Sequence, residues 1–175
     1  MRNAFALMLL IVLAIVSFER NALWTDDGTI WGDTIKKTPL KARGYNELGL
    51  NAIQVHDYAL AIDAFTKSLR LNPYMPHAYI NLGLAYEGLN QTDTAMLTYE
   101  KAIYIDPDDP TAYYNLGLLY YNVKKDRQKA LELFLKARDL NPLEPDVHQH
   151  LGYLYRDLGK NDLSNEELTL FKQLK

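Results

Sequence analysis

Two markers recur along this chain at one common interval, and that interval limits the folds open to the chain. Leu-Gly recurs at spacings of 34, 34 and 35 residues, at Leu48-Gly49, Leu82-Gly83, Leu116-Gly117 and Leu151-Gly152. Proline recurs at the same spacings, at Pro39, Pro73, Pro107 and Pro142. Self-similarity at a fixed period of this length is typical of repeat proteins, in which each unit packs only against its neighbours.

Within each period the apolar residues indicate two amphipathic helices. The first helix of the second unit has a stripe at i, i+3, i+4 and i+7, made of Tyr79, Leu82, Gly83 and Tyr86. A stripe on its second helix consists of Ala95, Tyr99 and Ala102. Asp106-Pro107 ends that second helix, because a residue before proline avoids the α region. The sequence predicts an all-α fold of about four hairpins at 42–75, 76–109, 110–144 and 145–175, with the one inserted residue in the turn near 124–126.

This pattern resembles the tetratricopeptide-repeat family, whose motif is W-x2-L-G-x2-Y, then A-x3-F, then P. The position of the Trp is taken by Tyr45, Tyr79, Tyr113 and His148. The second-helix motif is carried by Ala61-x3-Phe65, Ala95-x3-Tyr99 and Ala130-x3-Phe134. The fourth unit has Ser164 and Leu168 instead, so we expect its second helix to cap the open end of the stack. Over residues 42–175 the resemblance implies a right-handed α-solenoid that binds other proteins.

A hydrophobic run precedes the repeats. Residues 4–18 (AFALMLLIVLAIVSF) are nearly all apolar and uncharged. As a helix they span roughly 22 Å, which is less than the ~30 Å of a bilayer core. Three interpretations of this run are open: a single-pass membrane anchor over residues 1–21, a cleaved signal peptide, or a buried helix. The anchor is favoured because no small-x-small cleavage site follows the run, and the basic side chains weakly favour repeats on the extracytoplasmic side.

The joint at residues 22–41 repeats one more feature of the hairpins. Trp31 precedes Pro39 by eight residues, the offset that separates Phe65, Tyr99 and Phe134 from their prolines. We therefore expect a half-repeat helix that covers the first hairpin. Trp24 and Trp31 serve either as a binding site or for packing and interfacial anchoring. The joint also resembles the last membrane helix of glycosyltransferases with C-terminal tetratricopeptide repeats, but none of their catalytic machinery is present here.

The sequence shows none of the motifs that are typical of enzyme active sites or metal sites. The absence of Cys excludes disulfides and Cys-based zinc sites, and the net charge of −3 gives no basic footprint for nucleic acid. His148 and His150 are two residues apart, so on a helix they point to different faces and cannot form an i, i+4 metal pair. No Gly-rich phosphate loop or nucleophile motif appears. We expect a protein that is not an enzyme and needs no metal or other cofactor.

The concave face of the predicted stack is the candidate binding surface. Asn81, Asn115 and His150 each precede a Leu-Gly pair. By resemblance to the repeats of O-linked N-acetylglucosamine transferase, this position faces the groove, where Asn amides hold a peptide backbone. Alternatively, Asn is simply common there. The same resemblance adds further groove residues: Asn46, His77, Ile80, Leu84, Tyr114, Leu118, Tyr121, Tyr153 and Arg156, with Arg43 and Leu50. Because Asn46 and Leu50 occupy two of its positions, the carboxylate clamp of chaperone-binding repeats is absent.

Three functions are therefore open. The first is a membrane-anchored scaffold that binds proteins or peptides of unknown identity through its concave groove. The second is a detached or accessory substrate-recognition domain of a membrane glycosyltransferase. The third is self-association through the open N-terminal face of the stack. The repeat pattern favours the first, although a repeat fold defines a groove and not its ligand.

Overall fold

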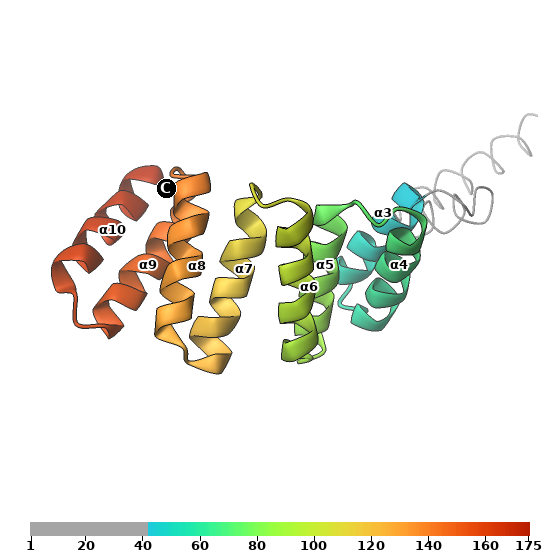
Figure 1. The fold of residues 1–175 in the computed structure, drawn as a ribbon, viewed down its shortest axis with the longest axis horizontal. Helices are drawn as coiled ribbons and strands as arrows, with labels where there is room; N and C mark the ends of the chain where they lie inside the picture. The colour runs from blue at the N-terminus through green and yellow to red at the C-terminus, as the bar shows by residue number, and fades with distance from the viewer. Residues whose placement is uncertain (1–41) are drawn as a thin grey trace, which may run out of the picture. The chain divides into compact units, whose positions relative to one another are not determined.

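The computed structural model describes residues 42–175, which form eight α-helices and one π-helical turn and contain no β-strand (Figure 1). In chain order these are α3 (Ala42–Gln54), α4 (Tyr58–Leu71), α5 (Pro76–Gly88), α6 (Thr92–Ile105), α7 (Pro110–Leu119), η1 (Tyr120–Lys124), α8 (Arg127–Leu140), α9 (Pro145–Asp157) and α10 (Asn161–Leu174). The prediction of an all-α repeat fold is thus confirmed for this range. The hydrophobic run and the half-repeat lie outside the described residues.

The helices pair in sequence order. α3 packs on α4 in one compact unit that ends at Leu71, and a second unit from Asn72 onward holds the other three pairs, α5 with α6, α7 with α8, and α9 with α10. Within the second unit α6 also packs on α7, and α8 on α9, so its three hairpins follow one another in a row (Figure 1). The buried apolar residues form two core clusters, one that contains Tyr99 and one that contains Phe134, and the partly buried Tyr113 and Tyr120 pack against both. Each cluster draws on neighbouring hairpins, because no single hairpin can bury its own apolar face.

The repeated Leu-Gly pairs are explained by close contact between the two helices of a hairpin. A Cβ added to Gly117 would lie 2.7 Å from the ring of Phe134, and Gly49 and Gly83 face Phe65 and Tyr99 in the same way. These three rings are fully buried. A glycine is therefore required wherever the second helix presents its large side chain. In the fourth hairpin Leu168 takes the place of the ring against Gly152.

Each hairpin turn has one residue in the left-handed region. These are His56, Asn90, Lys125 and Gly159, with φ between 56° and 73°. In three hairpins the turn residue follows the Leu-Gly glycine by seven positions, but Lys125 follows Gly117 by eight. We expected the extra residue in the turn near 124–126, but it does not lengthen the turn. It is absorbed within the helix as the π-helical turn η1, whose wider winding accommodates one additional residue.

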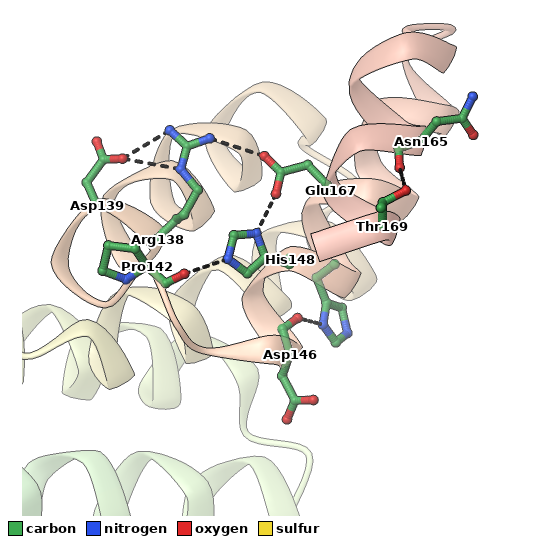
Figure 2. A network of polar contacts seen from close by, with 9 residues as sticks. Arg138, Asp139, Pro142, Asp146, His148, Asn165, Glu167 and Thr169 are labelled. Carbon is green, nitrogen blue, oxygen red and sulfur yellow. Dashed lines mark hydrogen bonds and ion pairs between the residues drawn. The ribbon is translucent and has the colours of Figure 1, made fainter. Parts of the chain in front are cut away.

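A buried polar network joins the last three helices (Figure 2). The Glu167 carboxylate of α10 accepts a hydrogen bond from Nη1 of Arg138 at 3.2 Å and lies 2.6 Å from Nδ1 of His148. The other ring nitrogen of His148 lies 2.8 Å from the carbonyl oxygen of Pro142. Glu167 and Ser164 are the only buried residues of α10, which leaves its other face to solvent in keeping with a terminal cap.

Candidate peptide-binding surface

The predicted groove residues all lie on the first helices of the hairpins or directly after one. Arg43, Asn46 and Leu50 are on α3, in the first compact unit. The rest belong to the second unit: His77, Ile80, Asn81 and Leu84 on α5, Tyr114, Asn115 and Leu118 on α7, Tyr121 on η1, and His150, Tyr153 and Arg156 on α9. The surface of the second unit is described below, and Asn46 is considered separately.

A pocket of about 380 Å³ opens between α5, α7 and the start of α9. Its lining includes three predicted groove residues, Leu84, Tyr114 and Asn115, together with Thr111. The loop before α9 and the first turn of that helix complete the wall with two carboxylates, from Glu144 and Asp146. The volume lies at the lower end of the range of ligand-sized pockets. A concave surface in the predicted region is therefore present in this unit.

Asn115 is the unusual residue of this pocket. Its side chain lines the pocket although the residue is only 9% exposed, and its amide makes no hydrogen bond to any residue in 42–175. The Asn81 amide, one period earlier on α5, is half-buried and equally without a partner among these residues. Both amides are thus available to a ligand as one acceptor and two donors.

The third residue of the predicted series, His150, is held within the protein. Its Nδ1 lies 2.8 Å from the Asp146 carbonyl oxygen and 3.1 Å from the Tyr114 hydroxyl. Its ring also contacts Tyr114, Phe134 and Tyr153 at centroid distances of 5.5, 5.8 and 6.2 Å. His150 therefore belongs to an aromatic cluster beside the pocket, and it offers less to a ligand than Asn81 or Asn115.

The remaining predicted residues fall into buried and solvent-facing groups. Ile80 is 4% exposed and belongs to the core. Leu118 is partly buried and packs against the core cluster that α8 and α9 form. On the surface, the Tyr121 hydroxyl donates to Asp157, Arg156 stacks on the Tyr153 ring, and His77 lies 3.2 Å from the Asp109 carboxylate. On α3, Oδ1 of Asn46 is buried without a hydrogen-bond partner among the described residues.

Negative charge dominates the pocket. Burial raises the pKa of the Tyr114 hydroxyl to about 12, and the carboxylates of Asp146 and Glu144 add to the shift. Neither carboxylate forms an ion pair with another residue in 42–175. Sequence reasoning missed Glu144 and Asp146 because it considered only positions around Leu-Gly. Their place directly before and within the first turn of α9 is the signal that could have revealed them.

Comparison with known proteins agrees with this arrangement of paired helices. Residues 42–74 and 111–143 each match a family model described as "Tetratricopeptide repeat", and residues 88–124 match one described as "TPR repeat". Among curated proteins, no sequence matches the chain. Similar solved structures include one titled "Crystal structure of MamA", 23% identical with a TM-score of 0.76, which covers 89% of this chain and 92% of that one. Another, MamA 41-end from Desulfovibrio magneticus RS-1, is 24% identical with a TM-score of 0.73 and covers 95% and 93%.

The stacked hairpins and the 34-residue period define a helical-repeat protein. With the three matched segments, the chain belongs to the tetratricopeptide-repeat family. The likeness to MamA extends this agreement to the fold. Between residues 42 and 175, no helix has both the length and the apolar character needed to cross a bilayer. In the same range no three side chains of metal-ligating type gather at one place.

Proposed function

We propose that this protein is a scaffold that binds an extended segment of a partner protein along the surface formed by α5, α7 and α9. The observation that carries the proposal is the nearly buried residue Asn115, whose amide lines a pocket and has no partner within residues 42–175. The tetratricopeptide-repeat family and the MamA-like fold support an interaction scaffold more generally.

The two Asn residues suit a peptide in its extended form. Asn81 and Asn115 occupy the same position of successive first helices, one period apart. Such helices lie roughly 10 Å apart in packed stacks, which equals about three residues of extended chain. Each amide can donate to a peptide carbonyl and accept from a peptide N–H. The backbone of the ligand would then be held at every third residue, and the pocket would receive an intervening side chain.

Replacement of both Asn81 and Asn115 with Ala is expected to weaken peptide binding about tenfold or more. Each lost hydrogen bond contributes about 0.5–1.5 kcal/mol, and the melting temperature should change little because neither amide has an internal partner. Peptides selected from a random display library against the full-length chain provide the ligand, with affinity measured by calorimetry. A large fall in melting temperature with unchanged affinity of the folded protein would instead make both residues part of the scaffold.

We also propose that residues 4–18 anchor the protein in a membrane with the repeats on the extracytoplasmic side. The support is the uncharged apolar run and the absence of a cleavage site after it. Full-length protein should stay in the membrane pellet after alkaline carbonate extraction, whereas a chain that begins at residue 22 should be released. An N-terminus near residues 15–20 in protein isolated from cells would contradict the anchor and indicate a cleaved signal peptide.

The other two functions remain predictions. Apart from Arg43, the segment on which the resemblance to glycosyltransferases rests lies outside the described residues, and the comparisons give it no support. Self-association through the N-terminal face predicts a molar mass that rises with concentration. Neither is needed to explain the pocket, because the pocket lies wholly within the unit that begins at Asn72.

A further inference from the structure

The pocket between α7 and α9 contains two carboxylates whose charge is not compensated. Glu144 is the residue that precedes α9, yet its side chain makes no capping hydrogen bond to that helix. Asp146 lies in the first turn of α9, and only its backbone carbonyl is engaged, by His150. Both side chains line the pocket, which has no lysine, arginine or histidine in its lining.

The helix N-termini at the pocket act in the opposite direction and must be weighed. The starts of α7 and α9 lie there, and each helix carries roughly half a positive charge at its N-terminus. At α7 the positive charge of the helix N-terminus is already compensated by Asp109, whose carboxylate accepts a hydrogen bond from the backbone N–H of Thr111 at 2.9 Å. At α9 it faces the two full negative charges of Glu144 and Asp146. The balance is negative, so an anionic ligand is disfavoured.

The remaining walls suit the body of a long basic side chain. Tyr114 contributes an aromatic ring, a group that attracts cations to its face, and Leu84 contributes an apolar surface for a methylene chain. The unpartnered Asn115 amide lies in the same pocket and can accept from the ligand. Carboxylates, an aromatic ring and an amide together match the guanidinium of arginine, which presents several donors in one plane.

We infer that this pocket binds a basic side chain, an arginine in preference to a lysine, of an extended peptide segment from a partner protein. The inference rests on the proposed function and adds the chemical class of the ligand. The peptide backbone would be held by the amides of Asn81 and Asn115, and the basic side chain would point between Glu144 and Asp146. Because the carboxylates are exposed to solvent, the attraction should weaken as salt is added.

The test selects peptides from a random nine-residue display library against the full-length chain and two double variants. Glu144→Gln with Asp146→Asn removes both pocket charges. The matched control, Asp162→Asn with Glu166→Gln, removes two exposed charges of α10 and leaves the same net charge. The unmodified chain and the control should enrich Arg or Lys at one fixed position, and the pocket variant should lose that enrichment.

A synthetic copy of the best peptide then isolates the charge. Substitution of its enriched arginine with citrulline keeps the shape and removes the charge, and should weaken binding to the unmodified chain about tenfold. The same substitution should have little effect on binding to the pocket variant. Equal affinities of the arginine and citrulline peptides for the unmodified chain would overturn the inference. If the Asn81 and Asn115 variant still binds the peptide more weakly, the proposed peptide-binding function stands without the basic side chain. If no peptide is selected at all, the proposed function falls as well.

Discussion

Replacement of Glu167 with Ala is expected to destabilise the C-terminal hairpin by about 3–5 kcal/mol, because it removes the shared partner of two buried or half-buried groups. Glu167 is only 6% exposed and lies between Arg138 of α8 and His148 of α9 (Figure 2). Arg138 would keep a second partner, since its Nη2 donates to Asp139 at 3.0 Å. His148 would keep only the carbonyl of Pro142, so most of the cost falls on α9.

The loss should be local to the end of the stack. In a repeat protein each unit contacts only its neighbours, so a weakened terminal hairpin can open while the rest remains folded. Hydrogen exchange of the backbone amides of α9 and α10 should therefore accelerate far more than that of α5 and α6. Melting of the whole chain is a poorer measure, because long repeat arrays need not unfold in two states.

Glu166→Ala is the control for this prediction. Glu166 is the preceding residue of α10 and is exposed, so its replacement should change the free energy of opening by no more than about 0.5 kcal/mol. If the Glu167 variant exchanges at the same rate as the Glu166 variant, the network does not hold the hairpin. The stability of α10 would then come from Leu168 against Gly152 and from the hydrogen bond of Ser164 to Gly152.

The repeat pattern contained enough information for the fold, since it reports contacts that every hairpin must make. Leu-Gly and the large side chain of A-x3-F are two sides of one contact, such as Gly83 with Tyr99. The turns could not be read in the same way. A left-handed residue is required in each, but the residue types differ: His56 and Asn90 are of types enriched in that region, whereas Lys125 is not, because only the backbone is constrained there. The π-helical turn appears in the sequence only as the 35-residue spacing, which does not tell whether the extra residue lies in the turn or in the helix.

The candidate site could be predicted only in part. Position within the repeat placed Asn115 on the pocket, but it could not indicate that the amide lacks a partner, which depends on all the surrounding side chains. Position within the repeat also predicted Ile80 as a groove residue, whereas its side chain lies in the core. For His148, the sequence did not reveal a polar contact that the structure shows. The repeat motif places this residue at the position of the Trp, but its contact with Glu167 depends on a residue 19 positions later.

Phe134→Ala is expected to cost about 3–5 kcal/mol and also to weaken peptide binding. The ring is fully buried against Gly117, so its removal leaves a cavity in the middle of the stack. Its centroid lies 5.9 Å from that of Tyr114 and 5.8 Å from that of His150, the two residues that support the wall of the pocket. Loss of this support should reduce affinity even at temperatures where the variant is folded.

The chain provides its own control for this change. At the matching position of the fourth hairpin, Leu168 packs against Gly152 as Phe134 packs against Gly117. Leucine therefore fits this contact, and Phe134→Leu should cost at most about 1.5 kcal/mol. Urea unfolding of the two variants, with affinity measured well below their melting temperatures, separates stability from the shape of the pocket. Equal stability of the Ala and Leu variants would show that the contact with Gly117 does not organise the hairpin. If the folded Ala variant binds peptide with unchanged affinity, the pocket wall does not depend on this ring.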